Sequence, residues 1–508
     1  MKHINTSHKI LAGLTAGSVI LLSLTACSET PAASTGESTK ATAETVKETV
    51  ITSETAFTDK DLEVGYDDSE AETITLNGDS AVTDSSSVTI DGSVITIKGK
   101  GTYIITGTLN DGYITVDAGD SDDIRLILQD AKITSSDYAA LYCLNADNVY
   151  ITLADGTENA LINEGDYDSK DDNKVDGAIF AKTDITINGT GALQVTSSAH
   201  GIVGKDDIAV TGGTITVTAE KDGIQANDSV AVQNTDINIT CGKDGIQADN
   251  DKDTTKGYVY IYSGNITIAS GDDGITASSF LQIDGGTVGI TESYEGLEGE
   301  TVIINGGKIS IVSSDDAINA ASDSSAEAMR DDGVSNIRIN GGDIYIRSEG
   351  DGVDSNGTLE MTGGNLIVMG PVRGGNGSLD VNGSATVTGG TVIMAGSADM
   401  ATNFTEASQG TILLSTGNQS QGSVISVTDS SGKVILGTTA DCAYACIVVS
   451  SPELTEGNTY TVTAGNFSET ITLTGNIYGS GGGFGGPGGG NPGGGRGGGP
   501  GFPGGPGF

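Results

Sequence analysis

The amino-acid sequence predicts an all-β protein whose main part is a parallel β-helix, a solenoid of stacked coils. Two motif series repeat along the chain with one shared period, close to 22 residues. Between the motifs, apolar residues occupy every second position, as in strands with one buried face. The helical pattern of apolar residues at i, i+3 and i+4 is almost absent after the first forty residues.

The first series consists of Gly-Gly pairs that precede alternating apolar residues. Its pairs begin at Gly212, Gly285, Gly306, Gly341, Gly363 and Gly389, with degenerate copies at Asn234 and Ser263. Successive starting positions are 22, 29, 22, 21, 35, 22 and 26 residues apart. Glycine pairs predict corners where φ is positive or where a side chain would clash with the next coil. The longer spacings predict loops at residues 249–256 and 321–332.

The second series consists of an acid followed by a small residue, usually glycine, and an aliphatic residue. Its acids are Asp222, Asp244, Asp273, Glu295, Asp316 and Asp351, and His200 takes the acid position of the first copy. Each repeat reads as three short strands separated by turns. A coil of this length that hydrogen-bonds to the coils above and below is a parallel β-helix.

The two ends of the chain predict an exported, anchored protein. Residues 1–27 resemble a lipoprotein signal peptide, because Leu24-Thr25-Ala26-Cys27 follows an apolar run, and Cys27 would accept a diacylglycerol. An ordinary secretory signal is the alternative. We expect a spacer at 28–56, the β-helix at 57–400, a β-rich cap at 401–478 and a Gly/Pro-rich tail at 479–508. The predicted product is an extracellular, membrane-anchored monomer.

The charge of the chain restricts its partners. Its 68 acidic and 24 basic residues give a formal net charge of −44, which argues against nucleic acid as a partner. Cations, or polymers bridged by cations, fit better. Cys143, Cys241, Cys442 and Cys446 form no CxxC pair, so zinc and redox motifs are poorly supported. Cys442 and Cys446 could form a disulfide or be buried core thiols, and we favour core thiols.

The second series predicts a row of carboxylates along the stack, because equivalent positions of neighbouring coils lie about 4.8 Å apart. Carboxylates at that separation repel by about 3.5 kcal/mol at an effective dielectric near 20. Calcium, which takes six to eight oxygen ligands, would neutralise them. A solvated acidic face or Asp-Gly turn chemistry is the alternative. The predicted metal ligands are Asp222, Asp228, Asp244, Asp249, Asp272, Asp273, Glu295, Glu298, Asp315, Asp316, Asp351 and Asp354.

Aromatic and basic residues near this row predict contacts with sugars. Tyr258, Tyr260 and Tyr262 alternate with apolar residues and would share the outer face of one strand, where their rings could pack against sugars or simply favour a strand. Lys205 and Lys243 lie beside the acids. A catalytic lysine needs a lowered pKa, which surrounding carboxylates oppose, so ion pairing is the preferred role of both.

These motifs resemble a family of clostridial cell-surface carbohydrate-binding β-helix proteins. The similar stretches are 101–104 with 109–112, 185–189, 204–208 and the acid-glycine-aliphatic series, within residues 57–475. The resemblance implies a right-handed helix shaped like polysaccharide lyases, bound calcium, and affinity for cellulosic or acidic plant polysaccharides. The predicted function is calcium-dependent polysaccharide binding without catalysis. A calcium-dependent lyase similar to pectate lyases and a structural surface adhesin are the alternatives.

Overall fold

A computed structural model describes residues 51–250, 252–322 and 331–479, all within one compact unit. The structure is 55% strand and 1% helix, which confirms the all-β prediction. In the described part of the chain, no helix has the length and apolar character that crossing a membrane requires. Predictions about Cys27 and the tail fall outside the described residues.

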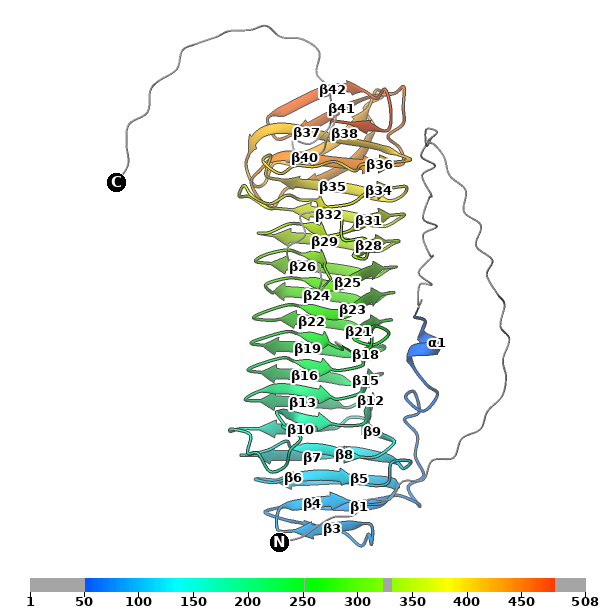
Figure 1. Cartoon of the computed structure of the whole chain (residues 1–508), viewed down its shortest axis with the longest axis vertical. Coiled ribbons are helices and arrows are strands. Elements are labelled where there is room, and N and C mark those ends of the chain that lie inside the picture. Colours follow the sequence, from blue (N-terminus) through cyan, green and yellow to red (C-terminus); the bar gives the residue numbers. More distant parts are fainter. Residues whose placement is uncertain (1–50, 251, 323–330, 480–508) are drawn as a thin grey trace, which may run out of the picture. The chain divides into compact units, whose positions relative to one another are not determined.

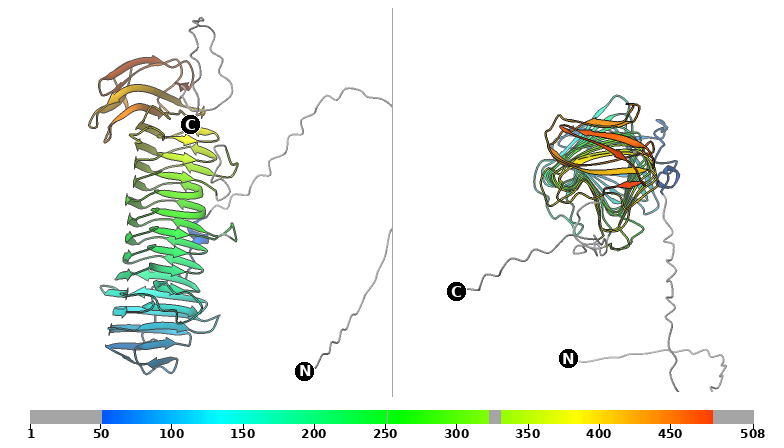
Figure 2. Two further views of the ribbon diagram at one scale, coloured as in Figure 1. Left: turned by 60° about the vertical axis from the view of Figure 1, so that its left-hand side comes forward. Right: turned by 90° about the horizontal axis from the view of Figure 1, so that it is seen from above.

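Most strands stack side by side in three ladders of parallel strands (Figures 1 and 2). Ladder one contains β10 (Glu158–Asn163), β13 (Ala192–Ser197), β16 (Thr214–Ala219), β19 (Asp236–Cys241), β22 (Asn265–Ala269), β24 (Thr287–Glu292), β26 (Lys308–Ser313), β29 (Asp343–Ser348), β32 (Asn365–Met369) and β35 (Thr391–Gly396).

Ladder two follows ladder one along each repeat and carries the acid series at its entrance. It contains β4 (Val94–Ile97), β6 (Tyr113–Asp117), β8 (Leu141–Asn145), β11 (Gly177–Ala181), β14 (His200–Gly204), β17 (Ile224–Ala226), β20 (Ile246–Ala248), β23 (Ile275–Ile283), β25 (Leu297–Ile304), β27 (Ile318–Ala320), β30 (Val353–Ser355) and β33 (Asp380–Val381).

Ladder three closes each repeat, and the long strands β23 and β25 run through ladders two and three. Its other members are β9 (Asn148–Leu153), β12 (Asp184–Gly189), β15 (Asp207–Val210), β18 (Ser229–Val232), β21 (Tyr258–Ile261), β28 (Asn336–Ile339), β31 (Thr358–Met361), β34 (Ala385–Val387) and β36 (Glu406–Ala407).

The strand register matches the predicted repeat. Ile215 pairs with Ile237, then with Ile266, Val288 and Ile309 in successive strands of ladder one. These inward residues are at most 2% exposed, so each ladder contributes one column of side chains to a continuous apolar core. The two long spacings are absorbed between β20 and β21 and between β27 and β28, where extra residues leave the stack intact.

Corners of the stack explain the glycine series. The second glycine of each pair has positive φ, for example 86° at Gly213 and 94° at Gly307, directly before a strand of ladder one. Gly223 has no positive φ, and the reason for a glycine there is lack of space. An added Cβ there would lie 2.5 Å from Ile239 Cγ2 and 2.6 Å from the Gly245 carbonyl oxygen of the next coil.

The first coils contain the strands β1 (Glu72–Gly78), β2 (Ala81–Val82), β3 (Val88–Asp91), β5 (Gly101–Leu109) and β7 (Asp123–Ser135). β1 pairs in parallel with β5, and β5 pairs in parallel with β7. The 13-residue β7 pairs with β9 through its first part and with β10 through its last part. At the other end, β35 pairs antiparallel with β40 (Tyr444–Ser451), which pairs with β37 (Gly410–Gln419), and β37 in turn pairs with β43 (Ile477–Tyr478).

A second, antiparallel sheet follows the stack. Its order is β39 (Val434–Thr439), β38 (Val424–Asp429), β41 (Thr459–Ala464) and β42 (Phe467–Thr472). The sheet shares an apolar cluster with β37 and β40 that is distinct from the core of the stack. Cys143, Cys241, Cys442 and Cys446 are buried free thiols, as the core interpretation predicts.

The segment 51–63, which we call the N-terminal strap, lies against the outer face of ladder three (Figure 1). It contains the helix α1 (Ser53–Ala56), and Phe57 packs on Tyr260 with ring centroids 6.2 Å apart. Gln282 Nε2 donates to the Ile51 carbonyl at 2.9 Å. The prediction of a disordered spacer to residue 56 is therefore wrong for 51–56, because Ile51 and Phe57 find an apolar surface to cover.

The strap is also fixed by polar contacts. Asp61, 6% exposed, accepts hydrogen bonds from Thr58 N at 2.7 Å and from Thr186 Oγ1 at 2.5 Å. Asn188 Nδ2 and Thr211 Oγ1 donate to its carbonyl at 3.1 and 2.7 Å. The strap thus crosses several coils of ladder three.

The close contact between coils at Gly223 gives a stability prediction. Gly223→Ala should destabilise the protein by about 2 kcal/mol or more, since backbone of the next coil must move. Gly289→Ala is the matched control, because its Cβ would have only the Ile266 carbonyl oxygen nearby, at 3.8 Å. Thermal unfolding of both variants measures the difference, and equal melting temperatures would show that coil spacing tolerates a methyl group at this corner.

Candidate functional site

The acid series forms one column at the entrance to ladder two. Residues two positions after each acid pair with one another: Ile224 with Ile246, Ile246 with Ile275, Ile275 with Leu297, Leu297 with Ile318, and Ile318 with Val353. The acids themselves therefore occupy the same position in successive coils. We call this set the acid column: Asp222, Asp244, Asp273, Glu295, Asp316 and Asp351.

Backbone N–H groups hold the carboxylates of the column. Asp222 Oδ1 accepts from Asp244 N at 3.2 Å, Asp244 Oδ1 from Asp273 N at 3.1 Å, and Asp273 Oδ1 from Glu295 N at 3.1 Å. The same contact joins Asp316 Oδ1 to Asp351 N at 2.6 Å. Each carboxylate is thereby oriented by the next coil, which turn chemistry within one coil would not achieve.

The lower end of the column has local partners. His200 Nδ1 lies 2.8 Å from Asp222 Oδ2, and Gln247 Nε2 donates to Asp244 Oδ2 at 2.7 Å. Lys243 Nζ, one residue before Asp244, pairs with Asp272 Oδ2 at 2.7 Å. Hydrogen bonds and cations therefore offset part of the repulsion at these coils.

Carboxylates crowd together in the middle of the column. Oxygens of Asp244, Asp272 and Asp273 lie within 4.8 Å of one another, and so do oxygens of Asp273, Glu295 and Glu298. Asp273 belongs to both groups, which we call the double acid cluster. Glu298 comes from the outer face of β25, where its Oε2 accepts from Thr276 Oγ1 at 3.0 Å.

Burial and mutual repulsion favour the protonated forms of these acids. Burial, then the charges of Asp222 and Asp272, raises the pKa of Asp244 to about 6. Burial and the charge of Glu298 raise the pKa of Glu295 to about 8. The pKa of Asp273 is also raised, by burial and then by Glu298 and Glu295. Without a bound cation, this cluster binds protons near neutral pH.

A buried amide adds an oxygen beside the cluster. Asn319 pairs in register with Glu298, is 8% exposed, and donates from Nδ2 to Glu295 Oε2 at 2.9 Å. Its Oδ1 is buried and accepts no hydrogen bond from the described residues. Such an orphaned carbonyl oxygen is costly unless a ligand occupies it. Amide and carboxylate oxygens together are the donor set that calcium takes.

A pocket of about 210 Å³ opens next to the cluster. Gln247, Thr276 and Glu298 line it from the outer face of ladder two, together with Asp249 and Ser278. Asp249, a predicted ligand, thus lies near Glu298.

The upper members of the predicted set form a looser group. Burial raises the pKa of Asp354 to about 8 and that of Asp351 to about 7, with the charge of Asp316 adding to both shifts. The pKa of Asp316 is raised to about 6 by burial and by Asp315. Asp380, which pairs in register with Asp354, continues this group and was not predicted.

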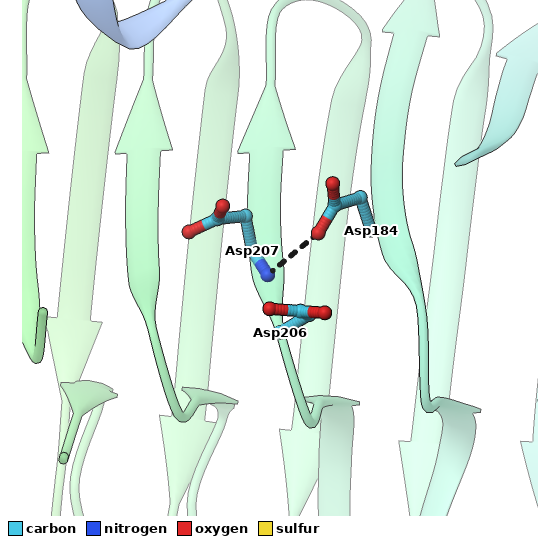
Figure 3. Close-up of side chains that lie close together, drawn as sticks. All are labelled: Asp184, Asp206 and Asp207. Atoms are coloured by element: carbon cyan, nitrogen blue, oxygen red, sulfur yellow. Dashed lines mark hydrogen bonds between the residues drawn. The ribbon is translucent and has the colours of Figure 1, made fainter. Parts of the chain in front are cut away.

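A further acidic group, which no repeated motif predicted, lies between ladders two and three. Oxygens of Asp184, Asp206 and Asp207 lie within 4.8 Å of one another, and Asp207 N donates to Asp184 Oδ1 at 3.2 Å (Figure 3). Asp228 lies near this group, because burial and then a hydrogen bond with Asp228 raise the pKa of Asp206 to about 7. The missed signal is the in-register pairing of Ile185 with Ile208, the residues that directly follow Asp184 and Asp207.

Asp228 is an exception among the predicted ligands. It forms an ion pair with Lys256, and Asn250 Nδ2 donates to its Oδ1 at 2.8 Å. The strand β17 separates Asp228 from the acid column, because Asp222 precedes this strand and Asp228 follows it. Asp228 also has a cationic partner already, Lys256. Of the predicted ligands, Asp244, Asp272, Asp273, Glu295 and Glu298 come together most closely.

The three predicted tyrosines do not share one exposed face. Tyr260 is 0% exposed under the N-terminal strap, so its prediction as an accessible sugar contact is wrong: Phe57 covers the ring. Tyr258 is half-buried and stacks on Phe280 at 4.9 Å, and only Tyr262, 42% exposed, is open to solvent. A strand pattern predicts which way a side chain points, but it does not predict which side chains a distant segment of the chain covers.

The two predicted lysines differ in environment. Lys205 lies over the ring of Phe180, with Nζ 5.4 Å from its centroid. The hydrogen bond and charge of Asp272 raise the pKa of Lys243 above its ordinary value. Lys243 therefore stays protonated at neutral pH, as the ion-pair interpretation predicts.

The raised pKa values predict how the metal-free protein responds to pH. Asp and Glu in an unfolded chain have pKa values of about 4, whereas in the folded protein the pKa values of Glu295 and Asp354 are raised to about 8. The folded state holds protons that the unfolded state has lost, so stability in chelator should rise as pH falls from about 8 to about 5. Thermal unfolding with chelator across this range is the measurement. Glu295→Gln should flatten the dependence, and an unchanged slope in that variant would contradict this account.

Known proteins resemble this chain over part of its length. Residues 91–328 match the family model described as carbohydrate-binding domain-containing protein. A protein of that description from Acetivibrio thermocellus is 38% identical over 124 residues, or 24% of this chain and 43% of the relative, so the match spans less than half of that relative.

The structure of a polysaccharide lyase-like protein from C. thermocellum, solved as a gadolinium derivative, is 30% identical. That match covers 57% of this chain and 96% of the other, with a TM-score of 0.40. The family match extends from β3 through ladders two and three past the double acid cluster. Residues 91–328 of this chain are thus similar to the carbohydrate-binding domain family.

Proposed function

We propose that this protein is a calcium-dependent polysaccharide-binding protein of the cell surface, built on a right-handed parallel β-helix. The observation that carries the proposal is the double acid cluster with the orphaned Asn319 Oδ1 beside it. Parallel pairing in three ladders with a repeat near 22 residues supports the β-helix. The family description supports carbohydrate as the ligand.

The residues present suit a calcium ion. Asp272, Asp273, Glu295 and Glu298 supply carboxylate oxygens, and Asn319 supplies an amide oxygen. This donor set contains no thiol or imidazole, which favours a hard cation over zinc. A bound divalent ion would remove the repulsion that raises these pKa values and would offer remaining coordination positions to oxygens of a ligand.

An acidic polysaccharide fits this surface better than a neutral one. A chain with a net charge of −44 repels polyanions unless cations bridge the two. Calcium in the double acid cluster would be such a bridge, and the neighbouring Lys243 would add a cation of its own. The pocket of about 210 Å³ beside Glu298 leaves space for part of a sugar unit.

We propose binding without cleavage. Removing a proton from a uronate requires an uncharged base, and Asp272 keeps Lys243 charged by raising its pKa. A lyase remains the alternative function, and the ultraviolet absorbance of unsaturated products tests it: a calcium-dependent rise with polygalacturonate would overturn binding alone.

Calcium and polysaccharide binding can be tested on one pair of variants. Asp273→Asn removes the carboxylate shared by both halves of the double acid cluster and should weaken calcium binding by about tenfold or more, since a charged ligand is lost. Asp91→Asn in the hairpin of β3 and β4 removes an equal charge far from the cluster and should change nothing. Calorimetry with calcium and pull-down on polygalacturonate and cellulose measure both effects. Retention that is equal in calcium and in chelator would refute the calcium dependence.

The surface location has its own test. If Cys27 carries the lipid, Cys27→Ser should move the protein from the membrane fraction into the culture medium, because one acylated residue provides the anchor. Fractionation with immunodetection is the measurement. A variant that stays with the membrane would contradict lipid anchoring at this cysteine.

A further inference from the structure

Tyr294 is an exposed aromatic residue next to the double acid cluster, and no motif in the sequence marked it. Tyr294 is 47% exposed, more than any other large aromatic residue in the described part of the chain. The next residue along the chain is Glu295, a member of the cluster. Its position is therefore unlike that of Tyr262, which lies after ladder three, away from the acid column.

Backbone hydrogen bonds stack Tyr294 into a column of its own along the corner. Lys243 N donates to the Lys221 carbonyl at 3.3 Å, Asp272 N to Lys243 at 3.3 Å, Tyr294 N to Asp272 at 2.7 Å, and Asp315 N to Tyr294 at 2.9 Å. Side chains from these coils follow one another at about 4.8 Å along the stack. That interval is close to the length of one sugar unit in an extended polysaccharide.

The order of side chains in this corner column suits an acidic sugar chain. Lys221 and Lys243 are about half-exposed at one end, with ion pairs to Asp176 at 3.8 Å and Asp272 at 2.7 Å. Tyr294 follows one coil above Asp272 and presents a ring to solvent. The Asp315 carboxylate of the coil above lies close enough to raise the pKa of the Tyr294 hydroxyl. The column therefore carries two cations that can meet carboxylates at one end, and above them, between Asp272 and Asp315, a ring that can meet a sugar face.

We propose that Tyr294 is the aromatic platform of a glycan subsite, and that Lys243 and Lys221 bind carboxylates of the same chain below it. The polysaccharide then runs along this corner, parallel to the stack, with its uronates bridged by the cation of the adjacent cluster. This inference rests on the proposed function and specifies the substrate as a polyuronate and the direction in which it lies. It also assigns a surface contact that the buried Tyr260 cannot make.

The ring and the hydroxyl can be separated by mutation. Tyr294→Ala should weaken binding of oligogalacturonate in calcium about tenfold, the scale of one aromatic contact. Tyr294→Phe should retain binding within about twofold, because the ring is the platform. Tyr262→Ala is the matched control on a comparably exposed tyrosine and should bind like wild type. Calorimetry at saturating calcium is the measurement, and circular dichroism checks that each variant folds.

The lysine has a specificity test. Lys243→Met should weaken oligogalacturonate binding about tenfold while leaving cello-oligosaccharide binding unchanged, since only the uronate carries a carboxylate. Wild type that binds calcium but no glycan would overturn the proposed function and this subsite together. If Tyr294→Ala binds oligogalacturonate as tightly as the wild-type protein does, the subsite alone is overturned. If Tyr262→Ala loses as much affinity as Tyr294→Ala, the effect belongs to exposed aromatic residues in general and the subsite is again overturned.

Discussion

Parallel pairing that keeps its register at equivalent strand positions is the constraint on which the rest of this structure depends. When Ile224, Ile246 and Ile275 pair in sequence, the strand residues beside them lie above their counterparts. The sequence repeat then places equivalent side chains in columns, in which successive side chains lie about 4.8 Å apart along the stack. Inward columns form the apolar core, and outward columns concentrate whatever chemistry the repeat carries. Gly223 and its equivalents keep the coils at this spacing, because a Cβ would reach the backbone of the next coil.

The same constraint imposes an electrostatic cost that the protein distributes unevenly. At the lower coils His200, Gln247 and Lys243 contact the acids directly. Higher up, backbone N–H groups still orient the carboxylates, but no Lys or Arg of the described residues pairs with Asp273, Glu295, Asp316 or Asp351. Burial, and then the charges of neighbouring acids, raises the pKa values of these four carboxylates. A divalent cation is the compensation that their oxygens suit.

Features that repeat could be predicted from the sequence, and features that arise once could not. The period, the corners, the loops after β20 and β27 and the alignment of the acids follow from motifs spaced along one chain. The strap could not be anticipated, because its contacts with Thr186, Tyr260 and Gln282 join residues more than a hundred positions apart. The group of Asp184, Asp206 and Asp207 was missed for a related reason: its members lie across a corner and not at one motif position.

The position before each acid explains why the double acid cluster forms where it does. That position holds Lys221 and Lys243 in the lower coils, Asp272 in the next, then Tyr294 and Asp315. The outward residue of ladder two changes in parallel, from Gln225 and Gln247 through Thr276 to Glu298. Two neighbouring columns thus change from basic or neutral to acidic within the same coils. The acid column already carries repulsion along its length, and this double change brings carboxylates from three columns together, which creates the strongest demand for a cation at one height of the stack.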